Sequence, residues 1–318
     1  MKPRVITILG PTASGKTALS VRLAKALGSA VISGDAFQVY RGMDIGTAKV
    51  TAEEADGVPH FLVDILDPRK PYSAARFCEM AGALIREENA AGRVPVLAGG
   101  TGLYIQSLLE GYEFLPKGEG RKSAWQAFYQ AHGSEGLAGE IRRRAPGADI
   151  PPDPQRRIRM LEVMDVEGAP KEAGKSRDLV FDGPVIGLAM EREELYRRID
   201  LRVERMVEAG LLSEVQRLLA EGVPEDAQSM RGIGYKEMIP VVKGEQPLSE
   251  AVRLIQKNTR HFAKRQITWY KRMPYIHWFS ADGNHGGLDY NMVQLYVISH
   301  LVNEQNADAN IGNHQEIL

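Results

Sequence analysis

GPTASGKT, at residues 10–17, matches the phosphate-binding pattern G-x-x-x-x-G-K-[ST]. Residues 5–9 before it form a β-branched run typical of a buried strand, and the residues after it repeat leucine at helical spacing up to Gly28. In such a strand, loop and helix, glycines let backbone N–H groups turn toward phosphate oxygens, and the helix N-terminus adds its positive dipole. The pattern predicts a phosphate-binding loop made of Gly10, Pro11, Thr12, Ala13, Ser14, Gly15, Lys16 and Thr17.

Two side chains in this loop have specific expected roles. Lys16 is placed to reach the terminal phosphate, and the Thr17 hydroxyl is placed to bind Mg²⁺, which we therefore expect as the cofactor. Such a loop usually holds ATP, but it recognises only a chain of anionic oxygens. The loop by itself leaves open which molecule carries the phosphate.

Short apolar runs recur along the chain, and turn residues and a helical pattern follow each of them. This alternation predicts an α/β fold, a P-loop NTPase-like parallel sheet flanked by helices. The expected strands are residues 5–9, 30–33, 61–65, 94–98, 185–189 and 275–279, and the long helices after the middle of the chain are 192–221 and 248–273.

The alternation is interrupted between residues 116 and 183, where the patterns are helical or turn-like and none indicates a strand. We therefore expect an all-α insertion within the α/β core. After Ser280 the periodic signal fades, and the polar last residues are expected to fray. The predicted organisation is 1–115 and 184–280 for the core, 116–183 for the insertion and 281–318 for a C-terminal extension.

Composition limits the class of protein. The 318 residues carry a formal net charge of −1, so nucleic-acid binding would have to come from local patches. The single cysteine, Cys78, excludes an internal disulfide and a cysteine-rich zinc site, and its helical surroundings favour a small core residue. No apolar run reaches the about 18–20 residues of a membrane span, and the first strand begins too early for a signal peptide. These features predict a cytoplasmic protein.

Ligands of parallel α/β sheets bind at the carboxyl ends of the strands, so the loops there carry the candidate chemistry. Asp35 follows the second strand and is either a general base, a partner of Mg²⁺-bound water or a helix N-cap. Thr101 lies in AGGTGLY after the fourth strand, a segment that serves either a close approach to ligand or a plain tight turn. Asp64 closes FLVDI and resembles the aspartate of ATP hydrolases, which favours a kinase or ATPase.

Two segments are cationic against the neutral background: residues 141–160, and residues 251–273, which contain no acidic residue. A solvated helix face normally mixes charge signs, so the second segment favours nucleic-acid contact over a merely exposed face. Its aromatic residues Phe262, Trp269 and Tyr270 are candidate stacking platforms. Its basic stripe consists of Arg253, Lys257, Arg260, Lys264 and Lys271.

Together these motifs resemble the tRNA dimethylallyltransferases over residues 5–278. The phosphate loop alone is generic, whereas the second motif and the last one are specific to that family. One departure is Ala36, where the family commonly has serine; the serine hydroxyl is missing but the carboxylate of Asp35 remains. In chain order the motifs are GPTASGKT, DAFQVYRGMDIGTAK, HFLVDILDP with YSAARF, VLAGGTGLY, QRRIRMLEV, RRIDLRVERM, GIGYKE and NTRHFAKRQITWY.

The resemblance implies that the phosphate belongs to dimethylallyl diphosphate, whose diphosphate is the leaving group. The acceptor would be the exocyclic N6 amine of an adenine 3′-adjacent to the anticodon, extruded from the RNA stack. Asp35 would take the amine proton, Thr101 would position the reacting groups and Arg202 would support the diphosphate. The implied tRNA contacts of this monomeric enzyme are Asp35, Ala36, Phe37, Gln38, Gln155, Arg156, Arg157, Ile158 and Arg159, beside Lys257, Arg260 and Lys264 of the basic stripe.

Other functions remain open on the sequence. A small-molecule or nucleotide kinase would use the same loop for ATP and the arginine-rich insertion as a lid, but it leaves the acid-free helix unexplained. An adenylate isopentenyltransferase would prenylate free AMP, yet it has no need of an RNA-gripping insertion. A GTPase-like RNA-binding module is disfavoured because no guanine-specifying N/T-K-x-D motif follows the loop.

Overall fold

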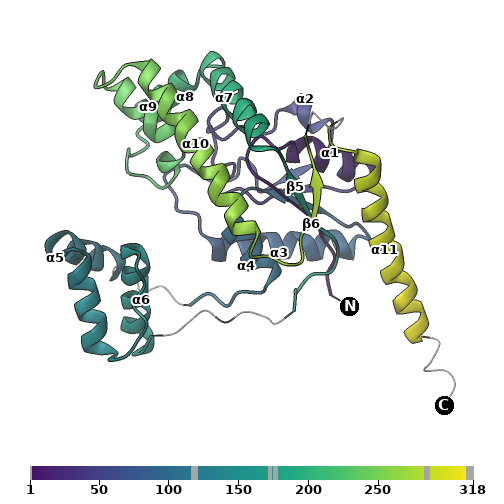
Figure 1. Ribbon diagram of the computed structural model, residues 1–318, viewed down its shortest axis with the longest axis horizontal. Coiled ribbons are helices and arrows are strands. Elements are labelled where there is room, and N and C mark those ends of the chain that lie inside the picture. Colours follow the sequence, from purple (N-terminus) through teal and green to yellow (C-terminus); the bar gives the residue numbers. More distant parts are fainter. Residues whose placement is uncertain (1, 116–120, 171–173, 175–177, 283–286, 313–318) are drawn as a thin grey trace. The chain divides into compact units, whose positions relative to one another are not determined.

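The computed structural model describes residues 2–115, 121–170, 174, 178–282 and 287–312. The chain divides into two compact units (Figure 1), one formed by Met1–Leu109 with Leu179–Leu318 and the other by Glu110–Asp178. The second unit thus begins before residue 116 and ends before residue 183, the limits expected for the insertion.

The larger unit is built on a six-stranded sheet with the order β3-β2-β4-β1-β5-β6, and its strand pairs are all parallel. The predicted fold class is therefore confirmed. The phosphate loop follows β1, a central strand, and leads into α1. The strands are β1 (Ile6–Leu9), β2 (Val31–Ser33), β3 (His60–Phe61), β4 (Val96–Gly99), β5 (Val185–Ala189) and β6 (His277–Ser280).

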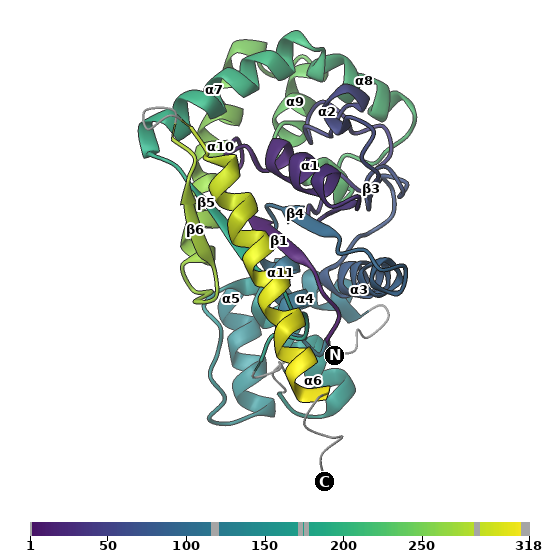
Figure 2. The same cartoon turned by 90° about the vertical axis from the view of Figure 1, so that its right-hand side faces the viewer.

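Alternate strand residues pack into two separate cores, one on each face of the sheet. Ile6 and Ile8 of β1 face the core that includes α1 (Lys16–Ala26) and α11 (Tyr290–Gly312), and Figure 2 shows these two helices on that side. Leu9, Ile32 and Leu97 face the core that includes α3 (Ala74–Ala90) and α4 (Gly102–Leu109).

Helix α11 corrects the expectation that periodic structure fades after Ser280. Its Val293 and Val297 are fully buried against the sheet. The helix is hard to recognise in the sequence because apolar residues, for example Met292 and Leu295, also occupy its exposed side. No single amphipathic stripe therefore indicates it. The expected fraying of the last residues falls partly on 313–318, which lie outside the described residues.

Four further helices and one 3-10 turn of the larger unit lie between β5 and β6 in the chain. The predicted single helix over 192–221 is wrong, because Gly210 adopts φ 100° and separates two helices there. The bounds are α7 (Arg192–Glu208), α8 (Leu211–Ala220), η1 (Ser229–Arg231), α9 (Tyr235–Val242) and α10 (Leu248–Tyr270); the short α2 (Ala52–Ala55) precedes β3.

The third strand is shorter than predicted and changes the interpretation of Asp64. Strand β3 ends at Phe61 on the edge of the sheet, and Leu62 and Asp64 adopt left-handed φ angles of 61° and 58°. The Asp64 carboxylate is 2.7 Å from Lys49 Nζ, and its side chain is 55% exposed. Asp64 thus holds a loop and lines neither of the cavities that contain the phosphate loop or Asp35.

The described residues of the smaller unit form two helices joined by turns and irregular segments, without a strand, as the sequence predicts. The helices are α5 (Arg121–Arg144) and α6 (Pro154–Glu167). Helix α5 is interrupted at Gly133, and α6 starts on an Asp153 cap with Pro154 in its first turn. Leu137, Ile141 and Leu161 form the centre of its core. In neither unit is any described helix long and apolar enough to span a bilayer.

Candidate active site

The phosphate loop contains two residues with left-handed backbone angles. Ala13 and Gly15 have φ angles of 64° and 90°, so the backbone turns twice before α1 begins at Lys16. The Lys16 ammonium lies back over the loop and donates hydrogen bonds to the carbonyls of Gly10 at 3.0 Å and Pro11 at 2.7 Å. The loop thus gathers a cation and a helix N-terminus at one point, which suits an anionic ligand.

The electrostatics of this point are unusual for lysine. Burial lowers the pKa of Lys16 to about 7, because removing an ammonium from water disfavours its charged form. The guanidinium of Arg202 lowers this pKa further, while Asp35 opposes the shift. Burial also lowers the pKa of Arg202. Two cations are thus held close together at low dielectric, an arrangement that a bound anion would stabilise.

The Asp35 carboxylate is bonded within its own turn and also lines a cavity, but no helix begins there, so it is not a helix N-cap. Its Oδ1 accepts hydrogen bonds from the backbone N–H of Phe37 at 2.8 Å and of Gln38 at 3.3 Å, as in an Asx turn. It also lines the cavity that contains Lys16. Thr101 Oγ1 accepts from the Ala36 N–H at 3.0 Å, so the loops after β2 and β4 are joined beside Asp35.

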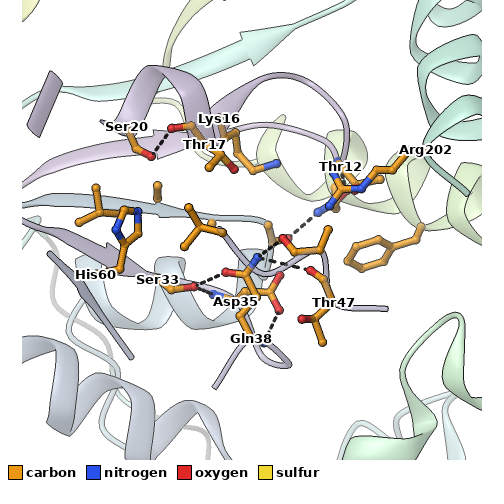
Figure 3. Close-up of a pocket in the computed structure, with 18 residues that line it drawn as sticks. Thr12, Lys16, Thr17, Ser20, Ser33, Asp35, Gln38, Thr47, His60 and Arg202 are labelled. Carbon is orange, nitrogen blue, oxygen red and sulfur yellow. Dashed lines mark hydrogen bonds between the residues drawn. The ribbon is translucent and has the colours of Figure 1, made fainter. Parts of the chain in front are cut away.

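Two cavities meet at these residues. The smaller, of about 110 Å³, contains Lys16 and Thr17 on one side and Asp35, Gln38 and Thr47 on the other (Figure 3). The larger, of about 350 Å³, has more apolar walls, with Ile199, Val203, Met206, Ile233, Ile255 and Phe37 among its lining residues. The residues common to both are Thr12, Asp35, Thr47, Arg202 and Phe262.

Gln266, which none of the sequence motifs singles out, is 4% exposed on α10. Its Oε1 accepts from the Thr12 N–H at 3.0 Å, and its Nε2 donates to the Gly100 carbonyl at 2.8 Å. The phosphate loop and the loop after β4 are therefore held by one amide. Gln266 occurs at helical spacing between Ala263 and Tyr270 on the buried face, so the same periodicity that revealed the basic stripe would also have revealed Gln266.

The basic stripe is only partly free. Lys257 and Lys264 are exposed, whereas Arg260 pairs with Asp200 of α7, an acid from outside the acid-free segment. The stacking role suggested for the aromatics is wrong for Tyr270, which is fully buried and donates to the Gly100 carbonyl at 2.9 Å. Trp269 is likewise packed against the backbone of Gly102, whereas Phe262 lines both cavities.

The residues of the smaller unit suggested for tRNA contact differ in their exposure and in their local contacts. Ile158 is 1% exposed, so its side chain is a core residue of the smaller unit and the suggested contact is wrong for it. Arg157 donates to the carbonyls of Ser134 and Pro151, which makes it a local brace. Gln155 and Arg156 are exposed, and Arg156 and Arg159 line a cavity within this unit.

In the larger unit, Phe37 lines the larger cavity, but the amide of Gln38 is engaged inside its own loop. It accepts from Ser33 Oγ at 2.9 Å and donates to the carbonyls of Thr47 and Ala48. Gln38 therefore shapes the wall of the smaller cavity rather than extending from it. Burial raises the pKa of the Cys78 thiol to about 12, consistent with an inert packing residue.

Fold and site together define a P-loop α/β protein whose phosphate loop opens into a partly apolar cavity. The family model described as IPP transferase matches residues 38–273, and the one described as isopentenyl transferase matches residues 3–64. The chain therefore belongs to the IPP transferase family and is an enzyme of the tRNA dimethylallyltransferase class.

Individual relatives agree with this assignment. The chain is 44% identical to the tRNA dimethylallyltransferase of Staphylococcus carnosus, over 87% of this chain and 91% of that protein. It is 41% identical to that of Geobacillus kaustophilus, over 96% of this chain and all of that protein. The crystal structure of a tRNA isopentenylpyrophosphate transferase from Bacillus halodurans superimposes with a TM-score of 0.72 at 39% identity, over 98% of this chain and 100% of that one.

The lowered pKa of Lys16 predicts how the affinity for inorganic diphosphate depends on pH. Lys16 is protonated below about pH 7, and a bound diphosphate raises its pKa, so binding takes up a proton above pH 7. Relative to Lys16→Arg, which stays charged, the wild-type affinity should fall by up to about tenfold per pH unit above 7. The affinity of both proteins for diphosphate is measured by calorimetric titration at several pH values, and the ratio of the two affinities cancels the ionisation of the ligand itself. If both affinities change with pH in the same way, the pKa of Lys16 is not lowered.

Proposed function

We propose that this enzyme transfers the dimethylallyl group of dimethylallyl diphosphate to the N6 amine of the adenine 3′-adjacent to the anticodon, releasing diphosphate. Its substrates would be tRNAs that read codons beginning with U. The observation that supports this best is the junction of the two cavities, where a polar phosphate site and an apolar wall share Asp35 and Arg202. A kinase needs no apolar chamber beside the transferred group.

Diphosphate binding would use the loop and its two nearest cations. The N-terminus of α1, Lys16 and Arg202 all place positive charge where the leaving group gains negative charge as the C–O bond breaks. Groups that bind the transition state more strongly than the ground state accelerate the reaction. The close pairing of Lys16 and Arg202, which is costly without an anion, suits this role.

Mg²⁺ would bind at Thr17 together with the diphosphate. Thr17 lines the smaller cavity beside Lys16, and Asp35 supplies a carboxylate to the same cavity. The described residues contain no cluster of three or more acidic, histidine or cysteine side chains suited to a metal. This fits Mg²⁺, which is commonly held by one or two protein oxygens plus substrate phosphates. When bound, the ion would neutralise charge on the diphosphate.

The transfer itself would be a substitution at the allylic carbon. The N6–C bond forms, the C–O bond breaks with its electron pair passing to the diphosphate, and the amine proton goes to Asp35. The hydrogen bonds from Phe37 and Gln38 hold one oxygen of Asp35, which leaves the orientation of the carboxylate fixed. Thr101 would act through its bond to the Ala36 N–H, by holding the loop that bears Asp35.

The tRNA would bind on the exposed cations of each unit. Lys257 and Lys264 on α10, and Arg231 and Arg265 at the larger cavity, supply charge without making an ion pair among the described residues. Phe37 would contact the extruded base or its neighbours. In the smaller unit, Gln155, Arg156 and Arg159 would contact the anticodon loop. We further propose that the enzyme acts as a monomer in the cytoplasm.

One experiment separates this function from its alternatives. The protein is incubated with labelled dimethylallyl diphosphate and tRNA lacking the modification, with the same donor and AMP, and with labelled ATP and tRNA. Label that reaches tRNA from the prenyl donor supports the proposal. Label that reaches AMP instead would indicate a free-nucleotide prenyltransferase, and phosphoryl transfer from ATP would indicate a kinase.

Asp35→Asn should lower kcat by about 10²- to 10⁴-fold, the usual contribution of a general base. The amide oxygen of the variant still accepts from Phe37 and Gln38, so the turn and the tRNA affinity should be nearly unchanged. The matched control is Asp44→Asn, which changes an exposed aspartate of the same loop that pairs with Lys49. Single-turnover rates measure the effect, and normal turnover in Asp35→Asn would remove this carboxylate from the mechanism.

Replacing Lys257 and Lys264 together by glutamine should weaken tRNA binding. It should also reduce the slope of log binding constant against log salt concentration by about 0.7 for each phosphate that is no longer neutralised. Arg260 is left intact because it pairs with Asp200. The control pair is Lys25→Gln with Lys243→Gln, two exposed lysines outside α10. Binding is measured at two salt concentrations. If both pairs behave alike, the stripe is a solvated face.

A further inference from the structure

A buried carboxylate on α8 holds the backbone of the loop that carries Asp35. Glu214 is 7% exposed. Its Oε2 accepts from the N–H groups of Asp44 and Ile45, both at 2.9 Å, and its Oε1 accepts from the Gly46 N–H at 3.1 Å. The Tyr235 hydroxyl of α9 donates to the same Oε1 at 2.6 Å. One side chain therefore receives four hydrogen bonds from two separate parts of the chain.

Among the described residues, backbone N–H groups and a hydroxyl, and not a cation, bind this carboxylate. Three successive backbone N–H groups form a small anion-binding nest, which Glu214 occupies from another element. Burying a charge is costly unless its hydrogen bonds are made, so the interaction strongly favours one position of the loop over all others. The nest could not be satisfied equally by a neutral amide, because one of the two acceptor atoms would become a donor.

The place of Glu214 links it to both sides of the reaction site. The loop it holds runs from Asp35 to Lys49, and Gly46 and Thr47 of this loop line the larger cavity. Helix α8 follows α7 directly, and α7 carries Arg202. Gly46 also lies so close to α9 that an added Cβ would be 2.5 Å from the Tyr235 ring. Loop, α8 and α9 are thus fitted together at the cavity wall.

We propose that Glu214 is a positioning residue for the prenyl transfer. By fixing loop 35–49 against α8 and α9, it sets the separation between Asp35 and Arg202, which line both cavities. This inference rests on the proposed function, since it concerns how the base and the diphosphate group are held relative to each other. Glu214 lines neither cavity, so its effect is transmitted through the loop backbone.

The test is Glu214→Gln, with Glu88→Gln as the matched control. Glu88 is equally buried, at 5% exposure, but it pairs with Arg93 and lines neither cavity. Glu214→Gln should lower kcat by about ten- to a hundredfold, the range expected when positioning is disturbed. The affinity for inorganic diphosphate should change by less than about threefold, because Gln266 holds the phosphate loop independently. Glu88→Gln should leave kcat unchanged.

Hydrogen exchange gives a readout that does not depend on turnover. In Glu214→Gln the amides of Asp44, Ile45 and Gly46 should exchange faster, while the amides of α3 remain protected. Tyr235→Phe removes one of the four donors and keeps the nest, so its effects should be smaller in both assays. If Glu214→Gln does not fold, Gly46→Ala tests the same contact from the loop side, because its Cβ would displace the loop from Tyr235.

Three results would contradict the positioning role of Glu214. The first is a wild-type kcat in Glu214→Gln, and the second is an equal loss of kcat in Glu214→Gln and Glu88→Gln. The third is a diphosphate affinity that falls in parallel with kcat. A failure of the proposed function is recognised separately, since the wild-type protein itself would then not transfer the prenyl group to tRNA. In that case the exchange and diphosphate measurements still decide whether Glu214 holds the loop.

Discussion

The close approach of two strand ends is the constraint on which the site depends. At the carboxyl ends of β2 and β4, a Cβ on Gly99 would be 2.5 Å from the backbone of Gly34, so only glycine allows these ends to meet. Their contact brings Thr101 within hydrogen-bonding distance of the Ala36 N–H, next to Asp35. Gln266 then ties the loop after β4 to the phosphate loop. Three loops from distant parts of the chain thus form one cavity.

The charge of the site contrasts with that of the chain. A formal net charge of −1 would attract no polyanion, yet Lys16 and Arg202 are held together beside the N-terminus of α1. Among the described residues that line the two cavities, Asp35 is the one acidic residue. A diphosphate would therefore supply most of the missing negative charge. Electrostatic function here comes from local burial, which magnifies charge interactions, and not from the overall composition.

Tertiary contacts explain three of the sequence-based expectations that were wrong. Asp64 matched a pattern of ATP hydrolases, but β3 ends early at the sheet edge and the aspartate pairs with Lys49. Arg260 belongs to an acid-free segment, but Asp200 from the neighbouring helix neutralises it. Helix α11 lacks a clear amphipathic stripe and is stabilised by packing of Val293 and Val297 on the sheet. In each case the deciding partner is distant in the sequence.

The sequence by itself determined the parallel α/β core, the helical insertion, the phosphate loop and the candidate base Asp35, because turn chemistry and side-chain periodicity depend on near neighbours. It also carried the motifs that identify the family. Only the tertiary structure decided which side chains hydrogen-bond which loops. Gln266 accepts from the Thr12 N–H, 254 residues away in the sequence, and Glu214 accepts from the Gly46 N–H, 168 residues away. Such contacts have no local signature, because they exist only after the sheet and its helices have packed.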